Sequence, residues 1–273
     1  MGVVNVTPDS FSDGGAFLDR DAAVNHGLRL AFEGADLLDV GGESTRPGAA
    51  PVSEREEHNR VIGVIEGIRA RDAAVRISID TSKAAVAAAA LDAGADYVND
   101  VTALRGDPDM AALVAERGVD VCLMHMLGTP RTMQSEARYG DVVADVKAFL
   151  YERVEAAVRA GIAVERIEVD PGIGFAKTIE HNLELLHRLG ELVDLGRPVV
   201  LGTSRKSFLG AITGRETAER MPATLATIVM GLERGAEVFR VHDVAPARDA
   251  LAVAAATLAR AWPTTPRTTT TRT

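Results

Sequence analysis

The chain has 273 residues, a formal net charge of −9 and a single cysteine. The negative charge argues against a scaffold that holds nucleic acid by neutralising its phosphates. Cys122 has no partner for an internal disulfide, and its place inside an apolar run favours core packing over a thiol function. The chain lacks both an apolar run of about 18 residues and a basic segment ahead of an apolar one, so we expect a cytoplasmic protein with no membrane span.

Short apolar runs that end on a polar residue or a glycine recur along the whole chain. We expect each to form a β-strand, near residues 2–6, 36–40, 75–79, 97–99, a run ending at His125, 166–169, 198–202 and 237–241. Stretches with helical spacing separate them, near residues 21–34, from Ser53 onward, 82–93, 107–117, 141–160, 179–195, 222–234 and 246–260. The second of these helices opens with Ser53 and Glu56 at capping-box spacing.

This alternation predicts an α/β protein, a (β/α)8 TIM barrel whose near-continuous apolar strands are covered by helices. The length matches one such barrel, which has about 250 residues. We expect a single domain over residues 1–261 and a disordered, threonine-rich tail over residues 262–273. Barrel enzymes carry their chemistry at the C-terminal ends of the strands, and the long polar loops after the first, second and fifth strands favour the same face.

Cationic residues follow the last two predicted strands. Ser204, Arg205 and Lys206 come after the seventh strand, while Arg240 and His242 lie on the eighth. Barrels often bind phosphate with the loops after these two strands, so the pattern favours an anion site. The alternative is solvated surface charge.

Asp80, Asn99 and Asp170 end the third, fourth and sixth predicted strands. Carboxylates and an amide at a barrel mouth can read a donor-rich, guanidine-like edge of a ligand. A general acid–base pair is a second possibility, and helix capping or a buried structural aspartate is a third.

The loop after the second strand reads GGESTRPG, and its residues 44–46 supply two hydroxyls and a guanidinium that fit a phosphate or a carboxylate. In the loop after the first strand, Asn5, Asp9 and Asp13 offer oxygen ligands of the kind that Mg²⁺ prefers. The same three residues are also common turn formers.

Taken in order, eight motifs resemble the dihydropteroate synthases, the pterin-binding enzymes of folate biosynthesis that sulfonamides target. The motifs cover residues 1 to about 260 and read MGVVNVTPDSFSDGG, DVGGESTRPGA, ISIDT, NDV, LMHMLGTPRTMQ, DPGIGFAKT, GTSRKSFLG and FRVHDV. The resemblance implies a (β/α)8 barrel, a homodimer and a transferase. The reaction would join 6-hydroxymethyl-7,8-dihydropterin diphosphate to p-aminobenzoate with Mg²⁺, releasing diphosphate by an SN1-like path.

The resemblance also implies roles for individual residues. The pterin would be held by Asp80, Asn99, Asp170 and Lys206, in a pocket lined by Met124, Phe175 and Gly202. The diphosphate would be held by Thr45, Arg46, Arg240 and His242, and Mg²⁺ by Asn5. The p-aminobenzoate would be framed by Phe11, Pro47 and Ser207. Catalysis would rest on Lys206, Asp80, Asp170 and Arg240.

Two alternatives remain at this point. A methyltetrahydrofolate-type methyltransferase shares the pterin-holding Asp and Asn residues but has no diphosphate to bind, and the GESTRPG, SRKS and RVHD motifs argue against it. A non-catalytic pterin-binding paralogue is the second, and the intact Thr45, Arg46, Lys206 and Arg240 argue against it.

Overall fold

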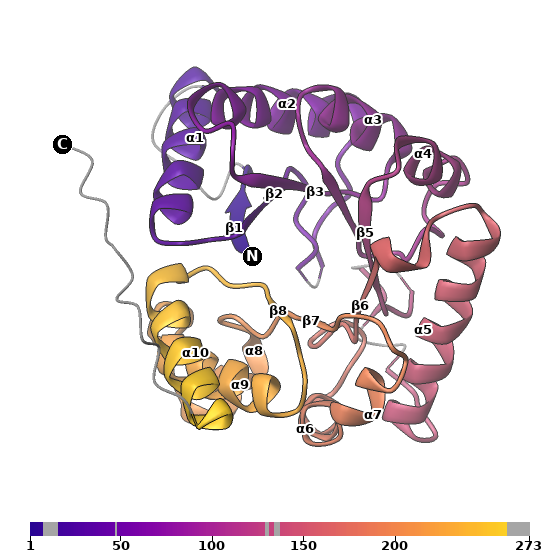
Figure 1. Ribbon diagram of the computed structural model, residues 1–273, viewed down its shortest axis with the longest axis vertical. Coiled ribbons are helices and arrows are strands. Elements are labelled where there is room, and N and C mark those ends of the chain that lie inside the picture. Colours follow the sequence, from indigo (N-terminus) through magenta and orange to yellow (C-terminus); the bar gives the residue numbers. More distant parts are fainter. Residues whose placement is uncertain (8–15, 47, 129–130, 134–136, 261–273) are drawn as a thin grey trace.

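The protein is described from a computed structural model that covers residues 1–7, 16–46, 48–128, 131–133 and 137–260. Strands lie at the centre of the molecule and helices surround them as an outer ring (Figure 1). This arrangement confirms the predicted α/β barrel architecture. The tail over residues 262–273 lies outside the described residues, so the domain boundary stays a prediction.

All strand pairings in the described part of the chain are parallel. The strands are β1 (Gly2–Asn5), β2 (Leu37–Gly41), β3 (Arg76–Asp80), β4 (Tyr97–Asp100), β5 (Asp120–Met124), β6 (Ile167–Asp170), β7 (Val200–Leu201) and β8 (Val238–Phe239). The first six form one sheet in chain order, and β7 pairs with β8. Single bridges, Gly2 to Val241 and Val169 to Val199, link the two sheets at both seams.

The helices follow the strands as the sequence pattern predicts, with two differences. They are α1 (Ala16–Phe32), α2 (Glu54–Arg71), α3 (Ala84–Asp92), α4 (Met110–Arg117), α5 (Val142–Arg159), α6 (Ile179–His187), α7 (Gly190–Val193), α8 (Ser207–Thr213), α9 (Met221–Glu233) and α10 (Val244–Ala259). The helix expected over residues 179–195 is two helices, because the backbone leaves the helical region at Arg188. The short α8 is not among the predicted helices; it ends at Thr213, and its C-cap residue Gly214 has the left-handed conformation.

Helix α2 shows how local sequence sets an element boundary. Ser53 is its N-cap and accepts a hydrogen bond from the Glu56 backbone N–H at 3.2 Å. The reciprocal half of a capping box is replaced by another contact, since the Glu56 carboxylate pairs with Arg60 one turn later. No helix in the described part of the chain is both long enough and apolar enough to cross a lipid bilayer.

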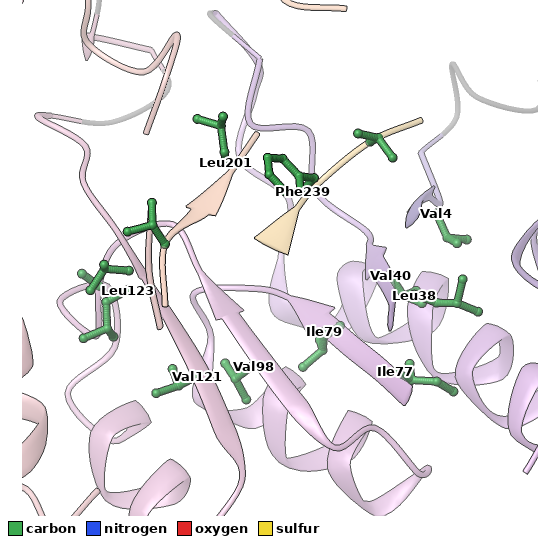
Figure 2. Close-up of a cluster of buried hydrophobic side chains, with 14 of the residues drawn as sticks. Val4, Leu38, Val40, Ile77, Ile79, Val98, Val121, Leu123, Leu201 and Phe239 are labelled. Carbon is green, nitrogen blue, oxygen red and sulfur yellow. The ribbon is translucent and has the colours of Figure 1, made fainter. Parts of the chain in front are cut away.

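Alternate positions on the strands build the main hydrophobic core between sheet and helices. Figure 2 shows part of this cluster, with labelled side chains from every strand except β6: Val4, Leu38, Val40, Ile77, Ile79, Val98, Val121, Leu123, Leu201 and Phe239. They pack with helix residues such as Ile65, Ile68 and Leu150, which are fully buried. The period of two is that of a strand with distinct faces.

The intervening strand positions face the barrel interior and are polar more often than the sequence pattern suggested. They include Asp39 on β2, Ser78 on β3, Asn99 on β4 and Glu168 on β6. The inward face is therefore mixed, because Leu37, Tyr97, Cys122 and Val200 form a second buried apolar cluster on the same side of the strands. Apolar outward positions suffice to attach the helices, which leaves the inward positions free to carry a site.

Candidate functional site

The strand register brings several predicted site residues to one level of the barrel. Asn5 pairs with Gly41, Gly41 with Asp80, and Asp80 with Asn99. Farther along the same sheet, Met124 on β5 pairs with Asp170 on β6. These positions lie at or near the C-terminal ends of their strands, so the side chains converge on the mouth of the barrel.

A buried ionic network crosses the mouth from β8 to β2 and β3. Arg240 Nε donates to Asp39 Oδ2 at 2.5 Å, and a second Arg240 nitrogen donates to Asp80 Oδ2 at 2.8 Å. Asp39 is fully buried and also accepts from Ser78 Oγ at 2.6 Å and from Asn99 Nδ2 at 3.2 Å. One carboxylate thus fixes the side chains of three other strands.

The same network changes the ionisation of Asp80. Burial, followed by the negative charge of Asp39, raises the pKa of the Asp80 carboxyl to about 7. Arg240 opposes this shift. Burial by itself would lower the pKa of Arg240, but Asp39 and Asp80 outweigh it and raise that pKa. The arginine therefore stays charged, while Asp80 changes its charge close to neutral pH.

Asp170 and Lys206 flank Gly202 at the same mouth, each close enough for its charge to act on the pKa of the other. Asp170 Oδ1 accepts from the Gly172 backbone N–H at 2.6 Å. A Cβ placed on Gly202 would lie 3.9 Å from both Asp170 Oδ2 and Lys206 Nζ, so the absent side chain leaves this corner open. Burial raises the pKa of Asp170, and burial lowers the pKa of Lys206 to about 8, with each charge opposing the other's shift.

An apolar surface adjoins this pair. The Lys206 ammonium lies 4.8 Å from the centroid of the Phe175 ring and also donates to the Ile173 carbonyl. Phe175 packs with Met124 in a cluster separate from the main core. The mouth therefore joins acidic and amide groups to one flat aromatic surface, which suits a planar heterocycle with a polar edge.

The predicted cationic group after β7 and β8 divides into two. Arg205 Nη2 lies 2.5 Å from Asp243 Oδ1, so this guanidinium is already neutralised and the predicted anion site loses one cation. Ser204 Oγ accepts from the His242 backbone N–H at 3.2 Å and lies 2.9 Å from His242 Nδ1. Burial, followed by the charge of Arg240, lowers the pKa of His242 to about 4. His242 is therefore neutral at neutral pH.

The remaining predicted residues lie at the rim. Thr45 is half-buried, while Arg46 is exposed and close enough for its charge to lower the pKa of His242 further. Asn5 is half-buried at the end of β1, and the exposed Ser207 begins α8. Two p-aminobenzoate residues and two candidate magnesium ligands, Phe11, Pro47, Asp9 and Asp13, lie outside the described residues.

Sequence reasoning left two buried groups without a role. Asp39 has no predicted role, although strand alternation places it on the same inward face as Gly41. Lys177 is buried and donates to His125 Nδ1 and to the Phe175 carbonyl, both at 2.9 Å. Burial lowers the pKa of Lys177 to about 7. The available sequence signal for Lys177 was its place shortly after a predicted strand end and the two glycines of DPGIG.

Comparison with known proteins agrees with this geometry. Residues 1–242 match the profile of the pterin binding enzymes. The dihydropteroate synthase of Escherichia coli K12 is 45% identical over 94% of this chain and 91% of its own length. The solved Xanthomonas albilineans dihydropteroate synthase with 4-aminobenzoic acid is 50% identical, with a TM-score of 0.89 over 96% of this chain and 93% of that one. The same enzyme with 7,8-dihydropteroate is 48% identical, with a TM-score of 0.86 over 96% and 94%. The chain therefore belongs to the pterin-binding enzymes and, within them, to the dihydropteroate synthase family.

Proposed function

We propose that this chain joins 6-hydroxymethyl-7,8-dihydropterin diphosphate to p-aminobenzoate, giving 7,8-dihydropteroate and diphosphate. The observation that carries the proposal is the meeting of Asp80, Asn99, Asp170 and Lys206 at one barrel mouth. Relatives that share most of this chain are named for the same activity, and one is solved with 7,8-dihydropteroate.

The acidic half of the mouth would bind the pterin. Asp170 would accept from the exocyclic amino group and a ring N–H, because a carboxylate with one free oxygen edge matches a guanidine-like pair of donors. Asp80 and Asn99 would read the remaining polar edge, and Phe175 with Met124 would cover the ring face. Lys206 lies beside Asp170 and would donate to a pterin acceptor.

The diphosphate would lie toward Thr45, Arg46 and His242. With the Ser204 hydroxyl donating to Nδ1, the neutral His242 ring would carry its proton on Nε2 and donate it to a phosphate oxygen. Charge for this site would come from Arg46 and from the outer edge of Arg240. Arg240 forms ion pairs with Asp39 and Asp80. It would therefore connect the acidic, pterin-binding half of the mouth to the diphosphate site and would not serve the diphosphate alone.

The bond changes follow from this placement. The C–O bond to diphosphate breaks with its electron pair on the leaving oxygen, and the exocyclic carbon becomes a cation delocalised over the pterin ring. Asp80 and Asp170, when ionised, would stabilise that positive charge, and cations at the diphosphate would stabilise the developing negative charge. The p-aminobenzoate nitrogen then donates its lone pair to the carbon and loses a proton to water, so no protein nucleophile is needed.

Mg²⁺ is part of the proposal, with Asn5 as its protein ligand. No group of three or more His, Cys, Asp or Glu side chains able to hold a metal exists among the residues that the structure describes. A single amide oxygen at the mouth still fits, because Mg²⁺ commonly keeps several waters and binds substrate phosphates. When bound, the ion would supply charge neutralisation at the diphosphate. Phe11, Pro47 and Ser207 would frame the p-aminobenzoate.

A homodimer and a cytoplasmic location complete the proposal. An apolar groove of about 680 Å³ runs between α9 and α10, lined by Leu225, Val229, Val253 and Leu258. Val253 is 70% exposed, which is high for an apolar side chain beside such a groove. A second copy would cover this face. Val253→Lys should then shift the sedimentation coefficient from dimer to monomer, and an unchanged value would place the interface elsewhere.

The direct test uses the purified protein with the dihydropterin diphosphate, p-aminobenzoate and Mg²⁺, and measures dihydropteroate by chromatography. We expect product only when all three are present, and loss of product on adding EDTA. Lys147→Met provides a control variant that should keep full activity, because Lys147 lies on α5 and its ion-pair partner, Asp194, is exposed. Folded protein that forms no dihydropteroate would refute the proposal. Diphosphate release without p-aminobenzoate would reveal the carbocation step.

A further inference from the structure

Three charged side chains outside the mouth form a compact cluster. Lys83 Nζ lies 2.5 Å from Glu43 Oε2 and also donates to Glu57 Oε2. Glu57 comes from α2 and is fully buried, whereas Glu43 and Lys83 are each 23% exposed. The pterin-binding and diphosphate-binding roles proposed above use none of the three.

Glu43 also closes the loop that carries Thr45 and Arg46. Its second oxygen, Oε1, accepts from the Val52 backbone N–H at 3.1 Å, which joins the two ends of the loop after β2. Just before it, the Gly42 carbonyl accepts from Arg60 on α2 at 2.7 Å. The base of this loop is therefore held against α2 by side chains, while Arg46 lies close enough to the mouth for its charge to lower the pKa of His242.

Lys83 links that base to the pterin side of the site. It lies three residues after Asp80 and is the N-cap residue of α3. The backbone N–H of Ala84, the first residue of α3, donates to Asp107 Oδ2 at 2.8 Å. Glu43 lies two residues before Thr45. A single ion-pair cluster thus connects the end of β3, which presents Asp80, to the loop that presents Thr45 and Arg46.

The burial of Glu57 indicates that the cluster is more than surface charge. A fully buried carboxylate is unfavourable unless it is paired, and Lys83 is its ion-pair partner. A Cβ on Gly42 would come within 3.1 Å of Glu57 Cγ, so the strand end packs directly on this side chain. Buried ion pairs of this kind can fix the register of the elements that they join.

We propose that Lys83, Glu43 and Glu57 are positioning residues that hold the loop over residues 43–52 in place over the diphosphate and p-aminobenzoate side of the mouth. The proposal rests on the proposed function for its kinetic consequence. Removing Lys83 would leave the pterin pocket of Asp170, Asn99 and Phe175 intact but would release Thr45 and Arg46 from their fixed position. Pterin affinity and turnover should therefore respond differently.

The test compares Lys83→Met with Lys83→Arg, Glu43→Gln and the control Lys147→Met. At pH 8, where Asp80 is largely ionised and the altered charge beside it matters least, we expect Lys83→Met to bind 6-hydroxymethylpterin with a nearly unchanged Kd. Under the same conditions kcat/KM for p-aminobenzoate should fall roughly ten- to a hundredfold, the range for losing a hydrogen bond to a charged group. Lys83→Arg should restore most of the loss because it keeps the charge. Glu43→Gln, at a partly buried position, should fold normally and show the same difference between pterin affinity and kcat/KM to a smaller degree.

Hydrogen exchange gives a readout that does not depend on the reaction. Amides of residues 43–52 should exchange faster in Lys83→Met, while those of α3 and α5 stay unchanged. Equal loss of pterin affinity and of kcat/KM, or unaltered exchange in residues 43–52, would overturn the positioning role. If the wild-type protein makes no dihydropteroate, the proposed function fails, and the exchange measurement still decides whether the cluster holds the loop.

Discussion

Replacing Asp39 with asparagine isolates the charge at the centre of the mouth. The amide oxygen can accept from Arg240 and Asn99 as Oδ2 does, and the amide nitrogen can donate to Ser78 Oγ. The substitution therefore keeps the shape and the hydrogen bonds of the network and removes one negative charge. Ser78→Ala is the matched control, because it removes one of these hydrogen bonds and leaves the charge.

The magnitude follows from the ionisation of Asp80. Its pKa is raised to about 7, with burial as the first cause and Asp39 as the second, so Asp39→Asn should lower that pKa. Each unit is worth about 1.4 kcal/mol, or a tenfold change in affinity for a ligand that needs the ionised form. Pterin affinity of the wild-type protein should fall about tenfold from pH 8 to pH 6. In Asp39→Asn the fall should be smaller.

The same pKa shift predicts how the stability of the protein changes with pH. Because the pKa of Asp80 is raised in the folded state from 3.8 to about 7, the folded protein binds this proton more tightly than the unfolded chain. The stabilisation is complete at low pH and is lost as the pH rises from about 4 to about 7. Asp39→Asn weakens this dependence, so its Tm should approach that of the wild type as the pH rises from 5 to 8.

Calorimetric titration with 6-hydroxymethylpterin and thermal unfolding between pH 5 and 8 measure both effects. The shared groups, Asp170 and Lys206 among them, titrate in both proteins, so the difference between the two curves reports on Asp39. Parallel pH curves for wild type and Asp39→Asn would refute the reasoning. A shift in Ser78→Ala as large as that in Asp39→Asn would also refute it, because geometry and not charge would then be responsible.

Three further predictions concern the mouth and its support. Asp170→Ala should weaken calorimetric binding of 6-hydroxymethylpterin by about 3 kcal/mol, since the ligand donors lose their partner; unchanged affinity would exclude the role. Arg240→Ala should lower pterin affinity as well as kcat and reduce the free energy of unfolding by about 3–5 kcal/mol in urea titrations, because two buried carboxylates lose their cation; loss of kcat alone would show that Arg240 serves only the diphosphate. Gly172→Ala should lower the free energy of unfolding by about 2 kcal/mol or more, because φ is +67° and the new methyl group would collide with the His125 carbonyl oxygen; an unchanged urea midpoint would contradict this.

The sequence by itself determined the fold class and the location of the site. Strand-length apolar runs alternating with helical stretches permit few architectures, and parallel strands place all their C-terminal ends on one face. Asp80, Asn99 and Asp170 could be chosen because each ends such a run. The family resemblance, carried by ordered motifs, then supplied the substrate.

The tertiary structure alone decided which charges meet. Arg240 contacts Asp39 and Asp80 across 201 and 160 residues of sequence, and no local pattern encodes such a pairing. Of the adjacent cations Arg205 and Lys206, only the second lies at the Asp170 corner, whereas Arg205 pairs with Asp243. The tertiary structure also determines the ionisation of Asp80, because burial and neighbouring charges, and not residue type, set its pKa.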